Sequence, residues 1–434
     1  MSDFPSSRYQ RGKIMAGAGF KVGRNYAKYH LQKRFGKHDD QSLNRLHENN
    51  ARHIYGEFTK LRGSALKLAQ ALSLDHSVLP DEFAEVMSQA QYSVPPINKA
   101  LVRSTIKKEL GKYPEELFKH FDAEAIAAAS IGQVHRATLK DGRDVAVKIQ
   151  YPNVRETIAS DLGLAKTLFR QIRYSDNLDS YFKEVKEKLL EETDYDIEGR
   201  SIEEYHKNYN YGNFVTPEWI KELSSQKVLT MTFLEGTHMK DFIEGNPTQE
   251  ERDHFGQLLW DFFHSQINSH HTVHADTHPG NFFYTPDKKL GIIDFGCVKK
   301  CSQDFFDAFI KLVPAHLGQD LEQITKLYED LEMIKPNPVD LEYEDQFFEF
   351  CRSFGELVVA PYREKRFDFG DPVFENKLKE LAKIAAEQPE PRGSKHFVYI
   401  ARVNLGLFYM LIKLKSNIRT EGATQHIYDY LEGK

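Results

Sequence analysis

Cysteine is scarce in this chain. Three cysteines, Cys297, Cys301 and Cys351, occur among 434 residues. So few thiols cannot build the disulfide framework of a small secreted domain, and they fit a reducing compartment. Cys297 and Cys301 have the spacing C-x₃-C, but no second ligand pair at metal-binding spacing accompanies them, so buried thiols are the simpler interpretation. We therefore expect a cytoplasmic protein.

An excess of positive charge is also missing. The chain has 58 lysines and arginines against 64 aspartates and glutamates, a formal net charge of −6. A nucleic-acid binder needs a basic surface to neutralise phosphates, so this balance disfavours that class. We expect no nucleic-acid partner.

Long hydrophobic runs are absent as well. The first residues, MSDFPSSRYQRGK, are polar, and no apolar run of a secretory signal follows them. The apolar stretch at residues 398–414 contains Arg402, Asn404 and Lys413, whereas a membrane span needs about 20 mostly apolar residues. We expect no signal peptide, no transmembrane helix, and a buried helix over residues 398–414.

The first 40 residues, in contrast, interleave cations with aromatic rings. These residues are Lys13, Lys21, Arg24, Lys28, Lys33, Arg34 and Lys37, with Phe20, Tyr26, Tyr29 and Phe35. The pattern fits a helical arm that docks on its own domain, which we favour. It also fits peripheral contact with an anionic membrane at its inner face, which stays the second interpretation.

The length and the 40% share of hydrophobic residues allow about three structural units. Residues 1–115 are mainly helical in pattern, residues 116–235 change to a strand pattern, and residues 236–434 return to helices. We expect a helical extension, a small sheet-containing lobe and a helical lobe with these boundaries.

The helical pattern of the first unit is clearest over residues 43–74. Its apolar residues recur at spacings of three and four: Leu61, Ala65, Leu68 and Leu72. Lys67 and Gln70 are three residues apart and therefore share one face of this predicted helix. A second helix is predicted over residues 97–110, ending at Gly111.

The middle unit begins with a predicted β-hairpin. Residues 126–139 and 143–150 have strand patterns and flank the turn signal Asp141-Gly142. A long charged, helical stretch separates this hairpin from another strand candidate, residues 228–233, and residues 290–294 form a short apolar strand among the later helices. This order predicts an α+β fold with two kinase-like lobes.

Lys148 is the first residue that can carry chemistry. It ends the sequence Val-Ala-Val-Lys on the second hairpin strand, where an ammonium group can neutralise the α- and β-phosphates of a nucleotide. Such a lysine needs a carboxylate partner, and Glu192, Asp194 and Glu198 are the candidates.

A polar loop supplies the second set of residues. The sequence HADTHPGN, residues 274–281, has the spacing H-x-D-x-x-x-x-N, which puts Asp276 near the phosphate acceptor and Asn281 on a metal ion. Asp294 follows 13 residues after Asn281, within Ile-Ile-Asp-Phe-Gly. Its carboxylate can bind Mg²⁺ that bridges the phosphates.

A transition-metal site is a competing interpretation of the same loop. Its ligands would come from His270, His271, His274, Asp276 and His278. Asn281 and Asp294 explain the loop with a hard, oxygen-ligated ion instead, so we favour Mg²⁺.

Small residues precede Lys148 where a protein kinase carries its glycine-rich loop. They are Ala127, Ala128, Ala129 and Ser130. Their backbone N–H groups can donate to phosphate, although each Cβ removes conformations that glycine allows and stiffens the loop. We expect this loop to contact the nucleotide phosphates.

Together these segments resemble the UbiB/AarF family of atypical kinase-like proteins, a group tied to ubiquinone and related prenyl-lipid metabolism. The resemblance covers about residues 55–300 and rests on KLAQ in the N-terminal helix, AAASIGQVH, VAVK, ETDY, HADTHPGN and DFG. It implies ATP or ADP with Mg²⁺ bound between the two lobes.

The resemblance also implies roles for single residues. The helix with Lys67 and Gln70 folds across the nucleotide cleft, and Glu192 and Asp194 form an acidic motif that faces it. A helix in that position would block a protein substrate, so the family looks better suited to ATP hydrolysis or small-molecule chemistry.

The remaining roles follow the general kinase pattern. Glu198 matches the carboxylate that pairs with Lys148, and Asp276 matches the catalytic-loop aspartate. Asn281 and Asp294 match the Mg²⁺ ligands.

Two positions depart from the family pattern. Ala69 replaces the glycine of the K-x-G-Q signature, which puts the fit of that helix over the cleft in doubt. Thr232 stands in the hinge where members commonly carry glutamate. Backbone groups usually hold adenine there, so we expect Met231 and Phe233 still to contact the nucleotide.

These features predict an atypical kinase or ATPase that transfers phosphoryl from ATP to water or to a small lipid-pathway substrate such as a prenyl-phenol. The alternative is a nucleotide-gated regulator or scaffold of a lipid biosynthetic complex, without useful turnover. A phosphotransferase of the antibiotic or choline type shares the loop spacing but does not explain KLAQ or the alanine-rich loop.

Overall fold

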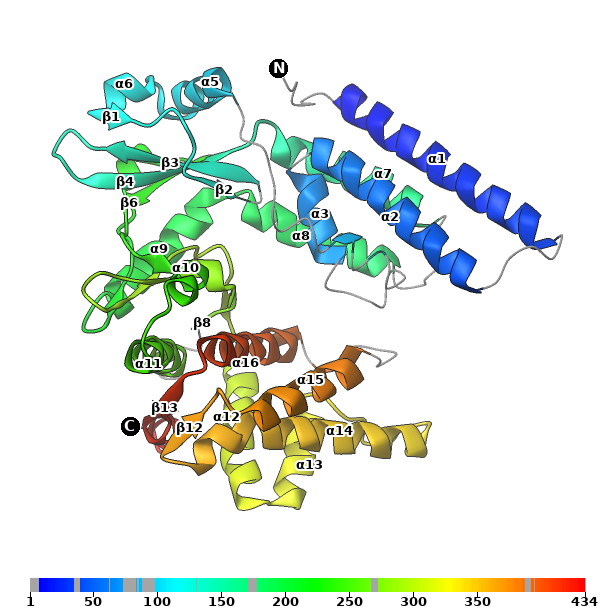
Figure 1. Ribbon diagram of the computed structural model, residues 1–434, viewed down its shortest axis with the longest axis vertical. Helices are drawn as coiled ribbons and strands as arrows, with labels where there is room; N and C mark the ends of the chain where they lie inside the picture. The colour runs from blue at the N-terminus through cyan, green and yellow to red at the C-terminus, as the bar shows by residue number, and fades with distance from the viewer. Residues whose placement is uncertain are drawn as a thin grey trace. The chain divides into compact units, whose positions relative to one another are not determined.

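Figure 1 shows the fold of the chain in a computed structural model. The structure describes residues 8–34, 40–61, 63–72, 83, 86–87, 98–129, 131–170, 178–266, 272–386, 392–393 and 395–433. The chain divides into two compact units, one of residues 1–200 and 218–233 and the other of residues 201–217 and 234–434.

Helices surround an apolar core in one part of the first unit (Figure 1). They are α1 (Arg8–Arg34), α2 (Asp40–Leu61), α3 (Ser64–Leu72), α7 (Val154–Phe169) and α8 (Leu178–Glu192). Phe58 of α2, Leu68 of α3 and Phe169 of α7 are almost fully buried in this core. Burial of such side chains stabilises the unit by about 1.5–3 kcal/mol each.

The N-terminal arm docks on its own unit. One face of α1 is buried, with Met15 and Val22 in the core. Arg11 on the same face forms a buried ion pair with Asp161 of α7, with 2.6 Å between Nη2 and Oδ2. This face of α1 therefore packs on its own unit, as the favoured interpretation of the first 40 residues expects.

The helix predicted over residues 43–74 is broken. α2 ends at Leu61 and α3 begins at Ser64, and between them Gly63 has a φ of +51°. A Cβ at Gly63 would lie 3.1 Å from the Val154 side chain, and residues with a Cβ rarely adopt this left-handed conformation. Leu61, Ala65 and Leu68 keep helical spacing on both sides of the break, so the apolar pattern predicted one continuous helix.

An antiparallel sheet forms the rest of the first unit. Its strands are β1 (His120–Phe121), β2 (Ala127–Ala129), β3 (Gly132–Thr138), β4 (Asp144–Gln150) and β6 (Val228–Thr232), in the order β1-β3-β4-β6 with β2 also paired to β3. The register aligns Lys148 with Val134 on one side and Leu229 on the other. Lys148 therefore lies on a central strand.

The turn and cap signals around this sheet are confirmed. Gly142 in the turn between β3 and β4 has a φ of +96°. Helix α5 (Lys99–Leu110) starts after Asn98, whose side chain accepts from the Leu101 N–H, and ends at Gly111 with a φ of +79°. Short elements complete this part of the unit: α6 (Pro114–Leu117) and η2 (Lys221–Leu223).

Helix α9 (Tyr195–Tyr209) begins in the first unit and ends in the second. The helices of the second unit are α10 (Met239–Glu244), α11 (Gln249–Ser265), η4 (Pro279–Asn281), α12 (Gln303–Gly318), α13 (Leu321–Asp330), α14 (Leu341–Val359), η5 (Ala360–Arg363), α15 (Pro372–Ala386), α16 (Lys395–Leu414) and α17 (Glu421–Leu431). Among the described residues, no helix combines the length and apolarity needed to cross a membrane.

Short strands of the second unit hold its polar loop. A four-stranded sheet has the order β5 (Phe214–Val215), β10 (Leu290–Ile292), β9 (Phe282–Tyr284) and β7 (Thr237–His238). Separate pairs join β8 (Thr272–His274) to β11 (Val298–Lys300), and β12 (Arg366–Asp368) to β13 (Asn417–Arg419). The predicted loop from His274 to Asn281 connects β8 with β9, and Asp294 follows β10.

Candidate nucleotide-binding and catalytic residues

Lys148 and Glu198 form a buried ion pair in the first unit. The Lys148 Nζ lies 2.8 Å from Glu198 Oε1 and 2.9 Å from Oε2, and the two residues are 8% and 5% exposed. Glu198 lies in the first turn of α9, where the helix dipole also favours a carboxylate. Among the three predicted partners for Lys148, the structure brings Glu198 to it.

The other two acidic candidates have different contacts. Glu192, at the end of α8, pairs with Lys67 of α3 at 3.0 Å. Asp194 Oδ1 accepts from the Asp196 N–H at 3.1 Å, and its Oδ2 lies 3.4 Å from the Gln226 amide. The KLAQ helix and the ETDY segment are thus joined through Lys67 and Glu192. The Gln70 side chain lies outside the described part of the structure.

The alanine-rich segment forms β2, the short strand that pairs with the start of β3. Ala127 and Ala128 are exposed, Ala129 is half-buried, and Ser130 lies outside the described residues. Gly132, across from Ala129, packs so closely on β4 that a Cβ would overlap the Ile149 carbonyl oxygen. The glycine of this segment therefore serves the approach of β3 to β4.

The predicted hinge residues end the last strand of the first unit. Met231 is buried opposite Ala146, and the Phe233 N–H donates to the Asp144 carbonyl at 2.9 Å. The Thr232 hydroxyl accepts from the Glu218 N–H at 2.8 Å. The Thr232 hydroxyl thus holds the backbone at Glu218, shortly before η2 begins at Lys221.

Asp276 and Asn281 are close neighbours in the loop between β8 and β9. The Asn281 Nδ2 donates to the Asp276 carbonyl at 3.3 Å, and Asn281 is 8% exposed. This bond fixes the orientation of the Asn281 amide. The Asp276 Oδ1 accepts from the His278 N–H at 3.3 Å.

Asp294 has a left-handed backbone, with a φ of +63°. This conformation is uncommon for residues other than glycine, although aspartate and asparagine adopt it more readily than most. Two contacts support it: its Oδ1 accepts from the Gly296 N–H at 3.1 Å, and its carbonyl accepts from His274 Nε2 at 2.9 Å. Burial lowers the pKa of His274, so the ring is neutral and donates from Nε2.

The described residues give no support to the transition-metal interpretation of the loop. Among the described residues, no three His, Cys, Asp or Glu side chains gather at metal-binding distances. His270 and His271 lie outside those residues, and His274 is fully buried. Cys301 is buried too, which raises the pKa of its thiol to about 11, as expected for an ordinary thiol.

Sequence reasoning missed two contributors to these sites. The Lys148 ammonium lies 5.2 Å from the centre of the Tyr195 ring, a cation–π distance. Gly406 of α16 packs on Thr277, next to Asp276, so closely that a Cβ would overlap the threonine side chain. Tyr195 was visible within ETDY, but no sequence signal links Gly406 to a loop 129 residues away.

Several known proteins that are named kinases or atypical kinases are similar in sequence to this chain. Yeast COQ8, named an atypical kinase of mitochondria, is 28% identical over 455 residues, covering 99% of this chain and 86% of that protein. The Dictyostelium discoideum probable serine/threonine-protein kinase abkA is 27% identical, covering 86% of this chain and 69% of that protein. Against coq-8 of Caenorhabditis elegans, the chain spans about half of the relative's length, 51%.

A solved structure shares the fold. The chain in the Rv3197–erythromycin complex from Mycobacterium tuberculosis is 26% identical, with a TM-score of 0.63, and the match covers 89% of this chain and 98% of that one. The predicted two-lobed, kinase-like α+β fold is confirmed. A model of the ABC1 atypical kinase-like domain matches residues 89–328, more than half of the chain. This protein therefore belongs to the ABC1 atypical kinase-like family, and the resemblance seen in its motifs is confirmed.

Proposed function

We propose that the chain binds ATP with Mg²⁺ and transfers the γ-phosphoryl group to water or to a small molecule of a lipid pathway. The observation that carries this proposal is the buried Lys148–Glu198 ion pair at 2.8 Å. Burying two charges costs several kcal/mol per ion, so such a pair is a poor way to stabilise a sheet. It is, however, the arrangement that keeps a lysine charged and oriented toward phosphate.

The loop of the second unit supplies the complementary chemistry. In this proposal Asp276 orients the phosphate acceptor, and the Asn281 Oδ1 and the Asp294 carboxylate are the metal ligands. Amide and carboxylate oxygens are the donors that Mg²⁺ prefers, so this donor set fits the ion. When bound, Mg²⁺ would neutralise charge that develops on the phosphates.

The remaining residues act by position. The backbone of Ala127–Ala129, with Ser130, approaches the phosphates, and Met231 and Phe233 approach the adenine ring. Catalysis by such a site is mostly positioning and electrostatic stabilisation. Family membership supports nucleotide binding and a role in isoprenoid-quinone or other prenyl-lipid metabolism.

ATP turnover by the purified chain tests the proposal. We expect Mg²⁺-dependent release of ADP, stimulated by liposomes or by a prenyl-phenol analogue, and its loss in Asp276→Asn. Tight nucleotide binding without turnover under any of these conditions would contradict it and would favour a nucleotide-gated regulator.

We also propose that α1 contacts an anionic membrane. The helix carries no acidic residue in its first turn or elsewhere, and Tyr9, Phe20 and Leu31 are 82%, 75% and 59% exposed. These residues are 11 apart, close to three helical turns, so they share one outer stripe. The exposed face of α1 combines these apolar residues with Lys13, Arg24 and Lys28 and with no carboxylate, so it suits contact with anionic lipid headgroups.

Sedimentation with liposomes tests this contact. We expect the protein to bind vesicles rich in anionic lipid and binding to fall at least fivefold in Phe20→Ser. Phe20 faces solvent, so the variant keeps the core intact. Equal sedimentation of both proteins would contradict the proposal.

A further inference from the structure

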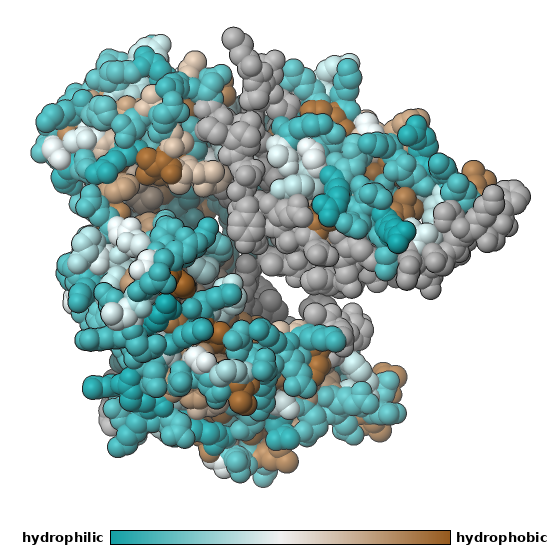
Figure 2. All heavy atoms as spheres, viewed as in Figure 1, coloured by the Kyte–Doolittle hydropathy of each residue, from teal (hydrophilic) through white to brown (hydrophobic). Residues whose placement is uncertain are grey.

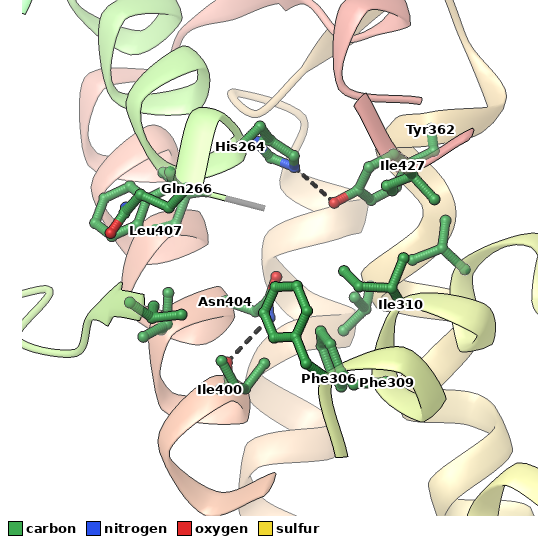
Figure 3. A pocket seen from close by; sticks show the side chains of 15 residues that line it. His264, Gln266, Phe306, Phe309, Ile310, Tyr362, Ile400, Asn404, Leu407 and Ile427 are labelled. Carbon is green, nitrogen blue, oxygen red and sulfur yellow. Dashed lines mark hydrogen bonds between the residues drawn. The ribbon is translucent and has the colours of Figure 1, made fainter. Parts of the chain in front are cut away.

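The second unit contains a small cavity that plays no part in the proposed site (Figure 3). Side chains of α11, α12, α16 and α17 surround it, and its volume is about 70 Å³. Phenylalanine, isoleucine, valine and leucine make up most of the lining, and none of the described lining residues carries a charged group. An occupant must therefore be neutral and largely apolar.

The volume limits what can enter. An apolar cavity of about 150 Å³ accepts benzene, and a water molecule needs roughly 10–15 Å³. This cavity is about half the size of the one that accepts benzene, so it suits an apolar group of roughly three or four heavy atoms.

The first polar group at the cavity is the hydroxyl of Tyr362. His264 Nδ1 donates to the Trp260 carbonyl at 2.7 Å, so His264 Nε2 accepts from the Tyr362 hydroxyl, also at 2.7 Å (Figure 3). Burial lowers the pKa of His264 to about 4, which keeps the ring neutral in this role. The Tyr362 proton is thus engaged, and its oxygen can only accept a further hydrogen bond.

The second polar group is the amide of Asn404 on α16. Its Nδ2 donates to the Ile400 carbonyl at 3.0 Å, which fixes the orientation of the amide (Figure 3). Within the described part of the chain, no donor contacts the Asn404 Oδ1. His264 and Gln266 also line the cavity, but their polar atoms already bond to the protein. Tyr362 and Asn404 therefore supply the acceptors, and an occupant that satisfies either must donate a hydrogen bond.

The cavity lies directly behind the loop that holds Asp276. Val273 and Gln266 line it, and the Gln266 Oε1 accepts from the His274 N–H at 2.8 Å. Helix α16, which supplies Asn404, also packs Gly406 on Thr277. An occupant that shifts α16 or Gln266 must therefore move the residues on both sides of Asp276.

We propose that this cavity binds a small, neutral, apolar alcohol, or the hydroxyl-bearing end of a larger one, and that its occupancy repositions the Asp276 loop. Binding itself does not depend on the proposed phosphoryl transfer. Only the consequence of loop movement for turnover rests on that function.

A matched pair of ligands tests the binding site. The full chain, labelled at isoleucine methyl groups, is titrated with propan-1-ol and with its isomer ethyl methyl ether, which has the same four heavy atoms but cannot donate. We expect saturable shifts at Ile310, Ile400 and Ile427, with about fivefold tighter binding of the alcohol, the usual value of one neutral hydrogen bond. Absence of saturable shifts with the alcohol would overturn the site, and equal affinities would overturn the acceptor assignment.

A variant pair sharpens the result. Asn404→Leu keeps the side-chain volume but removes an acceptor, so we expect it to reduce the preference for the alcohol and to leave ether binding unchanged. Tyr409→Leu is the control, because Tyr409 is on the same helix, is 51% exposed and does not line the cavity. A preference retained in Asn404→Leu would contradict the role of Asn404, and the ligand pair still decides if that variant fails to fold.

The link to the loop has its own readout. Methyl signals of Ala275 and Thr277 should shift along the same saturation curve as the isoleucine signals. Loop signals that stay fixed while the cavity fills would contradict the coupling, whatever the protein's turnover.

Discussion

Lys148 and the loop of Asp276, Asn281 and Asp294 are held in place by different means. Lys148 is fixed by a charged partner 50 residues away, Glu198. The loop is held mainly by hydrogen bonds to nearby backbone groups between His274 and Gly296, one of them donated by the neutral ring of His274. The proposed roles account for this difference, because a cation that binds phosphate needs a fixed opposite charge, whereas oxygen ligands of a metal ion need fixed geometry and no competing cation.

The largest expected effect is at Asp294. In the proposed function Asp294 is a negatively charged metal ligand, which Asp294→Asn removes. Since metal binding supplies several kcal/mol of transition-state stabilisation, we expect turnover to fall about a thousandfold. Steady-state release of ADP at several Mg²⁺ concentrations measures it. Asp287→Asn is the control, because Asp287 is an exposed carboxylate in the turn before β10 that pairs with Lys289. If both variants lose the same activity, the loop is not a metal site.

The charged pair is expected to matter for stability as well as turnover. Glu198→Gln removes the negative charge beside the buried Lys148 ammonium, so we expect the free energy of unfolding to fall by about 3 kcal/mol. Adding Lys148→Met to that variant should restore most of the stability and none of the turnover. Urea denaturation of both proteins measures this, and a double variant no more stable than Glu198→Gln would refute the pairing argument.

Acid should weaken the second unit through its buried neutral histidines. The pKa of His264 is lowered to about 4 in the folded chain against 6.5 in the unfolded one, so only the unfolded state binds the proton between these values. The contribution of neutral His264 to the free energy of unfolding is therefore fully present above pH 6.5. It falls by roughly 3 kcal/mol as the pH drops to 4. His264→Gln should flatten this slope in denaturation curves, and an unchanged slope would exclude His264 as its source.

The smallest effect is expected for the Lys67–Glu192 pair. Its side chains are 26% and 17% exposed, so solvent screens much of the attraction. A double-mutant cycle with Lys67→Met and Glu192→Gln should give a coupling energy below about 1 kcal/mol. A coupling several times larger would mean that this pair resembles Lys148–Glu198 more than a surface contact.

Local patterns predicted the loop better than the partner of Lys148. The H-x-D-x-x-x-x-N spacing and the DFG sequence fix residues that contact each other through nearby backbone, so sequence distance carries the information. Residue spacing alone left Glu192, Asp194 and Glu198 open as partners of Lys148, because the choice depends on how α8 and α9 pack. The family resemblance selected Glu198. The structure brings Glu198 to Lys148 and leaves Glu192 with Lys67.

Hydrophobic periodicity predicted the exposed faces of helices but not helix breaks or distant contacts. Figure 2 shows mainly hydrophilic residues over the exposed faces of the described helices of the first unit, as amphipathic helices predict. The break at Gly63 was not visible, because α2 and α3 keep apolar residues in one phase across it. The contact between Gly406 and Thr277 could not be predicted either, because a glycine in a helix indicates close packing but not which residue packs there.

Turnover of MgATP by Lys148→Met and Asp294→Asn, each beside the unmodified chain, tests the central claim most directly. The account predicts that the unmodified chain releases ADP and that turnover in each variant alone falls at least a hundredfold, because the proposed reaction needs both the ammonium group and the carboxylate. Full turnover in either variant would contradict the account, since one set of residues would then suffice without the other.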